Sequence, residues 1–170
     1  MKIKITFILV ALTTTALFAQ NGAFSKGDKL LNIGIGVNSF YDNGIPIGAS
    51  FEKGITNNIS VGLNADYLSS DYSSLKFTAI YFGARASYHV NELLKIESKK
   101  IDLYGGPTLG YRSFSWKDTD QNLGDDYGSG LYLGVYIGGR YYFNDKIGLF
   151  AEGGSIGSTN ARVGVAFKLK

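Results

Sequence analysis

The stretch that decides the fold is residues 160–170, NARVGVAFKLK, in which apolar residues alternate with small or charged ones. In an extended strand, alternate residues point to opposite faces. One face carries Val163, Val165, Phe167 and Leu169, and the other carries Arg162, Gly164, Ala166 and Lys168. An open edge with such an apolar face promotes aggregation, so we expect this strand to close a sheet on itself as a barrel.

The same alternation recurs in earlier stretches of the chain. They are residues 30–40, 45–55, 59–68, 76–90, 101–116, 128–143 and 147–155. Together with the last stretch they predict an all-β fold, an eight-stranded antiparallel up-and-down barrel. An apolar outer face with a polar inner face is typical of a transmembrane barrel and inverts the arrangement of a soluble one. A soluble lipocalin-like carrier is the alternative fold.

Charged residues gather on the face opposite the aliphatic side chains. They are Glu52, Asp66, Arg85, Asp102, Arg112, Arg140, Glu152 and Arg162. An unpaired charge in a hydrophobic core costs several kcal/mol, so these residues are expected to line a lumen and to pair there. We predict a charge network that stabilises the barrel and has no catalytic role.

The connections and strand ends have their own patterns. Residues 69–75 and 117–127 are predicted polar loops, and residues 91–100 form a longer connection. Aromatic residues near the strand ends are expected in the girdles at the membrane interface. These are Tyr41, Tyr67, Tyr88, Tyr111, Trp116, Tyr141 and Phe143.

The first 19 residues are typical of a cleavable signal peptide. Lys2 and Lys4 precede an apolar run from Ile5 to Leu12, and Ala19 ends a small-residue cleavage motif. The alternative, a membrane-spanning helix, needs about 20 apolar residues, which this run does not reach. We therefore expect residues 1–19 to be the signal peptide and residues 20–170 to be the barrel domain.

Charge and cysteine content exclude several classes of function. Removal of the signal takes two of the 17 basic residues and none of the 14 acidic ones, which leaves the rest close to +1. This charge supports no nucleic-acid partner. The sequence has no cysteine, so it has no disulfide, no thiolate metal site, no thiol nucleophile and no lipid-anchored cysteine.

From Leu30 to Lys170 the alternating strands and the closing strand resemble the small eight-stranded outer-membrane barrels, the OmpA- and OmpX-like family. This resemblance implies the bacterial outer membrane, with both termini in the periplasm. It also implies an assembly signal in the last strand, read by the outer-membrane insertion machinery. That signal would be Arg162, Gly164, Phe167 and Leu169, although the chain ends on a lysine where the family commonly has an aromatic residue.

Candidate chemistry is sparse. Some barrels of this size modify lipid A with a serine and a histidine, and Ser87 lies two positions from His89, the only histidine. Both are predicted to face the lumen and not the lipid, which weakens an enzymatic role. The loop residues Asp118, Asp120, Asp125 and Asp126 offer hard oxygen ligands but lack the spacing of a calcium loop. We predict no catalytic residue, metal or cofactor.

Three classes of function fit the sequence. The first, which we favour, is a structural or interaction barrel with a filled polar lumen and short surface loops. The second is a narrow channel for small or hydrophobic molecules, and the third is a lipid-modifying enzyme. The expected partners are outer-membrane lipid, lipopolysaccharide and the assembly machinery, with the protein itself a monomer.

Overall fold

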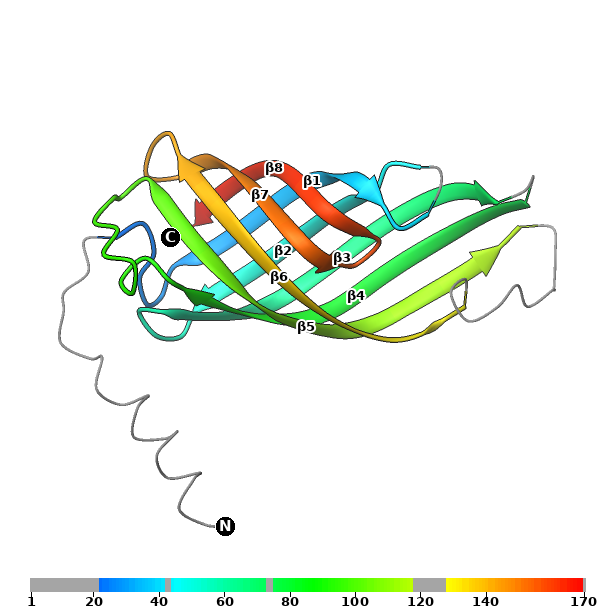
Figure 1. Cartoon of the computed structure of the whole chain (residues 1–170), viewed down its shortest axis with the longest axis horizontal. Helices are drawn as coiled ribbons and strands as arrows, with labels where there is room; N and C mark the ends of the chain where they lie inside the picture. The colour runs from blue at the N-terminus through cyan, green and yellow to red at the C-terminus, as the bar shows by residue number, and fades with distance from the viewer. Residues whose placement is uncertain (1–21, 42–43, 73–74, 118–127, 170) are drawn as a thin grey trace, which may run out of the picture.

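The computed structural model describes residues 22–41, 44–72, 75–117 and 128–169, and their strands form a closed antiparallel barrel (Figure 1). Each strand pairs with its neighbours in the sequence, and the first pairs with the last. The strands are β1 (Lys29–Ser39), β2 (Ile47–Gly54), β3 (Ile59–Tyr72), β4 (Leu75–His89), β5 (Ile101–Trp116), β6 (Gly130–Tyr142), β7 (Ile147–Ile156) and β8 (Thr159–Leu169). The predicted eight-stranded fold is therefore confirmed.

The last strand closes the barrel as its alternation predicted. β8 pairs with β1 in a register that sets Ile33 opposite Val165 and Lys29 opposite Leu169. The outward faces of the two strands therefore join into one apolar surface, and Arg162 is left on the inside. No residue of β8 remains at an open edge along this pairing, which satisfies the backbone of the terminal strand.

β6 illustrates how the two faces differ. Its outward residues Leu131 and Ile137 are 81% and 74% exposed, whereas the inward residues Tyr136 and Arg140 are 3% and 2% exposed. The strand thus presents aliphatic side chains to the surroundings and buries a guanidinium. The barrel interior is filled by side chains and carries the polar groups.

The two ends of the barrel differ in shape. Residues 22–28 and the end of β8 lie at one end, which we call the terminal end (Figure 1). At the opposite or far end, β3 and β4 extend past β1 and β2 as a projecting hairpin (Figure 1). The far-end wall is consequently higher on one side than on the other.

The predicted polar loop at residues 69–75 is wrong. β3 continues to Tyr72, and the hairpin pairs Ser69 with Thr78, Ser70 with Phe77 and Asp71 with Lys76. Cross-strand hydrogen bonds satisfy this backbone, and the polar side chains of Ser69 and Asp71 face outward. A strand that extends beyond an apolar band needs no apolar outer face, so its sequence looks like a loop.

The other predicted boundaries lie within two residues of the observed strands, apart from those that fall on residues outside the described ones. The connection between β4 and β5 contains helix-like hydrogen bonds, in which Leu94 N donates to Val90 O over 2.9 Å and Lys95 N donates to Glu92 O over 3.1 Å. Within the described part of the chain, no helix long and apolar enough to span a membrane is found.

Aromatic and aliphatic side chains pack inside both ends of the barrel. A far-end cluster comprises Tyr41, Leu68, Phe77, Ala79 and Tyr81, with Phe114, Trp116 and Tyr132 packed against it. A terminal-end cluster comprises Ala23, Tyr142, Phe150 and Ala166. Tyr41 and Trp116 therefore belong to the inside, and their predicted place in the outer girdle is wrong; Tyr67, Tyr88, Tyr111, Tyr141 and Phe143 do point outward.

Candidate functional site

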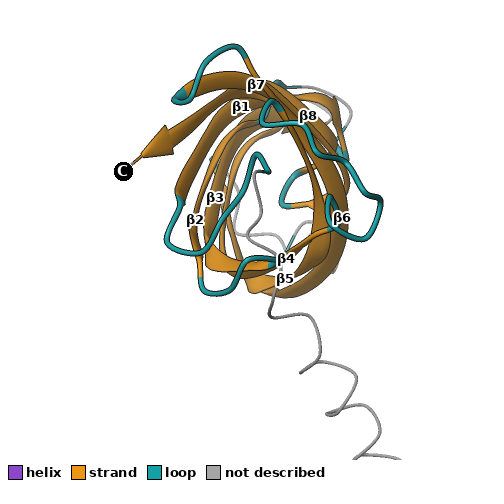
Figure 2. Ribbon diagram, turned by 90° about the vertical axis from the view of Figure 1, so that its left-hand side faces the viewer, coloured by secondary structure: helices purple, strands orange, loops and turns teal. Residues whose placement is uncertain are grey.

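The charged side chains in the middle of the lumen come one from each of seven neighbouring strands. They are Glu52 on β2, Asp66 on β3, Arg85 on β4, Asp102 on β5, Arg140 on β6, Glu152 on β7 and Arg162 on β8. All seven are at most 4% exposed. The inward positions of the strands thus bring these charges into the buried interior of the barrel, which we call the polar layer; Figure 2 shows the backbone of that barrel from one end.

Arg140 occupies the centre of the layer. Its Nη1 donates to Asp102 Oδ2 over 2.8 Å, its Nη2 to Glu52 Oε1 over 3.0 Å, and its Nε to Asn32 Oδ1 over 3.0 Å. The guanidinium also lies 3.8 Å from the ring centroid of Tyr104. Every nitrogen of the side chain has an acceptor, which a buried arginine requires.

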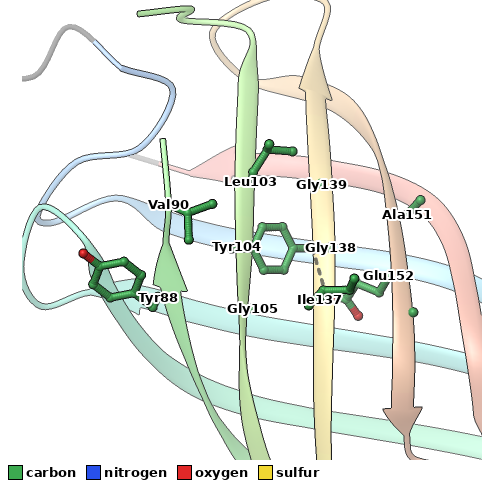
Figure 3. A pocket seen from close by; sticks show the side chains of 11 residues that line it. Tyr88, Val90, Leu103, Tyr104, Gly105, Ile137, Gly138, Gly139, Ala151 and Glu152 are labelled. Atoms are coloured by element: carbon green, nitrogen blue, oxygen red, sulfur yellow. Dashed lines mark hydrogen bonds between the residues drawn. The ribbon is translucent and has the colours of Figure 1, made fainter. Parts of the chain in front are cut away.

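A second arginine joins β4 to β7. Arg85 Nη2 donates to Glu152 Oε1 over 2.7 Å, and its Nε donates to Tyr136 OH over 3.0 Å. Tyr104 OH donates to the same Glu152 oxygen over 2.8 Å (Figure 3). This hydrogen bond passes Gly138, where an added Cβ would lie 2.8 Å from the Tyr104 ring. A glycine at this inward position is therefore needed for the two side chains to meet.

Glu52 connects the two arginines. Its Oε1 lies 3.0 Å from Arg140 Nη2 and 3.4 Å from Arg85 Nε. Its Oε2 accepts from Ser60 Oγ over 2.7 Å and from Ser87 Oγ. The carboxylate is fully buried. The two guanidinium groups and the two hydroxyl donors compensate for the loss of water around it.

His89 lies at the terminal-end edge of this layer, in a chain with the connectivity of a hydrolase triad. Its Nδ1 is 2.7 Å from Asp102 Oδ1, and its Nε2 is 3.0 Å from Ser60 Oγ. The proton of Ser60, however, is donated to Glu52. Ser60 therefore does not present its proton to Nε2, as the serine of a hydrolase triad would. Ser60 is also fully buried, away from any lipid substrate.

Asp66 and Arg162 form a separate pair on the far-end side. Arg162 Nη2 donates to Asp66 Oδ1, and the pair packs over Gly48, whose added Cβ would lie 2.7 Å from Arg162 Cζ. Asp66 Oδ2 and Arg162 Nε are buried without a partner among the described residues. An internal water is the usual partner of such atoms.

Arg112 lies at the far-end side of the lumen, in register with Tyr81 on β4, which itself pairs with Asp66 on β3. It is ten residues further along β5 than Asp102, or about 30 Å of extended strand. Its Nε donates to Gly128 O over 2.9 Å, and its guanidinium lies 5.6 Å from the Phe114 ring. The alternation correctly predicted that the Arg112 side chain points inward. Its position along the barrel axis depends on the strand register, which the sequence does not give.

The terminal end of the lumen is covered by residues 22–28. Phe24 stacks on the His89 ring with centroids 3.4 Å apart, and Lys168 Nζ donates to Ala23 O. Gly27 N donates to Gly54 O over 2.9 Å, which ties the segment to the end of β2. Figure 2 looks at this end, where the segment before β1 crosses the mouth. The polar layer is thus enclosed between packed side chains at both ends.

Several members of the network were not among the predicted site residues. They are Asn32, Ser60, Ser87, Tyr104 and Tyr136, which supply neutral hydrogen bonds between the charges. All of them occupy inward positions of the alternation, which was the available signal. Phe24 lies outside any strand, and no sequence pattern indicated that it enters the barrel.

The predicted aspartate loop and signal peptide lie outside the described residues, as does most of residues 117–127. Among the residues that are described, no group of three or more histidine, cysteine or acidic side chains is arranged to hold a metal ion.

Comparisons with solved structures identify the same fold in small membrane barrels. The outer-membrane protein OprG of Pseudomonas aeruginosa matches 88% of this chain and 99% of its own, with 12% identity and a TM-score of 0.56. The N-terminal β-barrel domain of OprF from the same organism matches 85% and 98%, with 16% identity and a TM-score of 0.53. A transmembrane β-barrel designed de novo matches 85% and 98%, with 17% identity and a TM-score of 0.51.

No protein-family pattern matches the sequence, and no curated protein matches it either. At these identities the structural likeness establishes the fold alone, the eight-stranded barrel of outer-membrane proteins. A designed chain shares that fold, so the fold does not specify a biological role.

Proposed function

We propose that this chain, which has the fold of the small eight-stranded outer-membrane barrels, is an integral protein of the bacterial outer membrane with a structural or interaction role. The observation that carries the proposal is the contrast between the barrel's two surfaces. The outer wall exposes Leu131, Leu133, Val135 and Ile137 at 68–81%, whereas the interior buries ion pairs. A bilayer is the solvent that matches this arrangement.

The expected topology follows from the even strand number. Both ends of the chain then lie on one side of the membrane, which for such barrels is the periplasm. The terminal end would face the periplasm and the projecting β3–β4 hairpin would face the outside. Residues 1–19 would direct export and be removed, and residues 20–170 would form the barrel domain.

The closed interior supports a structural role over that of a porin. Eight strands enclose a lumen that side chains nearly fill. In this lumen Arg85 and Arg140 cross between strands, and clusters of aromatic residues close both ends. The Ser60 hydroxyl donates to Glu52 and not to His89, which does not favour the lipid-modifying alternative.

Two measurements test the proposal. The expressed protein should remain with the membrane after carbonate or urea extraction and require detergent for release. In planar bilayers, the purified protein should give no steady conductance of porin size. Release without detergent would contradict membrane integration, and steady conductance would favour the channel alternative.

A further inference from the structure

The outer wall carries an open hollow near the terminal end, and a smaller one over β3, β4 and β5. The larger hollow has a volume of about 720 Å³ and is lined by residues of four adjacent strands, among them the inward-facing Tyr104 and Glu152, and by the connection that follows β4 (Figure 3). Leu103, Ile137 and Tyr88 form its rims, and its floor is the bare backbone of Gly105, Gly139 and Gly153. Its volume falls within the range of ligand sites of about 300–1,000 Å³.

The hollow results from the register of the strands. Gly139 on β6 lies opposite Leu103 on β5 and Ala151 on β7, while Ile137 lies opposite Gly105 and Gly153. Small residues therefore follow one another across β5, β6 and β7 where other parts of the wall carry Leu, Ile or Val. An added Cβ at Gly153 would meet only Asn160 O, at 3.9 Å. The space is open, and its lining is largely apolar, with Glu152 as its charged member.

The connection between β4 and β5 adds a second feature beside the hollow. Leu93 and Leu94 are 70% and 56% exposed, although they lie outside the strands. Val90 N donates to Leu103 O over 2.9 Å, and Leu103 N donates to Asn91 Oδ1 over 2.7 Å. The connection is thus fixed to the rim of the hollow. Exposed leucines at this height are suited to the interfacial part of a bilayer leaflet.

Cations border the same place. Lys99 and Lys100 directly precede β5, and Lys146 directly precedes β7; all three are exposed. None of the three forms an ion pair with another described residue. Glu97 and Asp145 are exposed acids close to them in the sequence, and Asp102 points into the lumen, so the excess of positive charge is small and local. Lysines next to an apolar surface at a membrane boundary attract anionic headgroups.

We propose that this hollow and its lysine border form a binding site for an anionic glycerophospholipid of the periplasmic leaflet. An acyl chain lies over Gly105, Gly139 and Gly153, and the phosphate lies at Lys99 and Lys100. The inference rests on the proposed membrane integration and orientation. It goes further by assigning one lipid class to one face of the barrel.

A second copy of the chain is the less suitable occupant. A symmetric dimer brings the same patch of both subunits together. Lys99, Lys100 and Lys146 would then face the same lysines of the partner, which is unfavourable in a low-dielectric boundary. A phospholipid matches both features of the wall. Its hydrocarbon chain lies at the height of the apolar hollow, and its negative charge lies at the height of the lysines.

The test uses the full mature barrel purified in detergent and mixed with phosphatidylglycerol or with zwitterionic phosphatidylcholine. Native mass spectrometry counts the lipids that stay bound. The wild type should retain phosphatidylglycerol in preference to phosphatidylcholine. The double substitution Lys99→Gln/Lys100→Gln should weaken phosphatidylglycerol binding about thirtyfold, because each lysine near a charged surface contributes about 1 kcal/mol.

A second variant tests the hollow itself. Gly153→Leu should abolish retention of either lipid at this site, since its side chain would fill the open space. Ala65→Leu on the outer face of β3 is its matched control, and Lys76→Gln/Lys117→Gln at the far end is the control for charge. Both controls should bind as the wild type does.

The outcomes are distinct. Equal retention of the two lipids, or equal losses in the variants and their controls, would overturn the proposed site. Detergent-dependent extraction from membranes, measured on the same variants, reports membrane integration separately. A wild type that needs no detergent would overturn the proposed function first, and the lipid site with it.

Discussion

At the scale of single residues, Arg140 shows why a buried charge is either well paired or costly. It serves two carboxylates and an amide, all of them buried. Arg140→Ala would leave Asp102 and Glu52 short of a counter-ion in a place that water reaches poorly. We expect a loss of about 3–5 kcal/mol in the free energy of unfolding.

That loss should appear in urea titrations followed by gel mobility of the folded barrel. Lys117→Ala, an exposed lysine beyond the end of β5, is the control and should unfold at the wild-type midpoint. Equal midpoints for the two variants would show that the lumen charges are independently hydrated.

Ser60 allows a test of the triad-like connectivity. Because its hydroxyl donates to Glu52, we expect no reaction of the folded protein with a fluorophosphonate probe. Ser60→Ala should instead lower stability by about 1–3 kcal/mol, since it removes one donor from a buried carboxylate. Ser87→Ala, which removes another donor to Glu52, should behave similarly. Labelling of Ser60 in the wild type would contradict our assignment of the hydrogen bonds.

Much of the lumen could be predicted residue by residue, and its pairing could not. Alternation alone placed Glu52, Arg85 and Arg140 inside, because side-chain direction in a strand depends only on parity. Which acid meets which arginine depends on the relative shift of strands that are distant in the sequence. The same limitation explains why Arg112 was grouped with Asp102, which lies ten residues away on the same strand.

At the scale of elements, residues 22–28 cover the terminal-end mouth of the barrel, and their attachment there depends on Phe24. Phe24→Ala would remove the stacking on His89 and free the segment from the mouth. We expect faster tryptic cleavage after Lys26, which is exposed but lies in a bound segment. Membrane extraction should be unchanged. Leu93→Ala at the same end is the control, and equal cleavage rates would exclude this role for Phe24.

β8 carries the proposed assembly signal, and its residues face two ways. Arg162 and Gly164 point inward, while Phe167 and Leu169 lie on the outward face. Phe167→Ala should slow insertion by the outer-membrane assembly machinery but leave spontaneous refolding in detergent nearly unchanged, since the side chain packs little inside. Phe51→Ala, an outward aromatic on β2, is the control. An equal effect of both variants would assign the defect to lost apolar surface.

The β3–β4 hairpin marks where element prediction failed. Ser69, Ser70 and Asp71 have the composition of a loop, because a strand that projects beyond the apolar band has no need for outward aliphatic residues. Strand pairing with Phe77 and Thr78 holds them in the sheet nonetheless. Periodicity of hydrophobicity identifies the part of a strand inside the band, and hydrogen bonding determines where the strand ends.

At the scale of the whole molecule, closure should make the protein a monomer. Every strand of the barrel has two neighbours, so no edge is left to pair with another copy. Sedimentation in detergent should therefore give one chain of at most 18.4 kDa per micelle. A two-chain species that survives dilution would contradict this expectation and would require a contact between outer walls.

The fold of the whole molecule was predictable because nearly every strand repeats the same signal, and agreement among strands outweighs ambiguity in any one. The biological role was not predictable in the same way. A barrel with this alternation can be a protein designed de novo, so the alternation does not specify a role. The residues that would distinguish roles lie in surface features such as the hollow over Gly139, and the hydrophobic periodicity does not predict such features.

The far-end cluster also determines what tryptophan fluorescence can report about the unfolding of this protein. Trp116 is the only tryptophan in the chain, and it packs against Phe77 in that cluster, with ring centroids 5.3 Å apart. The emission spectrum of Trp116 therefore reports the environment of the far-end cluster, and it does not report the environment of Arg140 and the carboxylates in the middle of the lumen. If the far-end cluster loosens before the charged middle of the lumen, the red shift of the emission spectrum will occur at a lower urea concentration than the change in electrophoretic mobility. The interval between the two transitions will then measure how strongly the two regions are coupled.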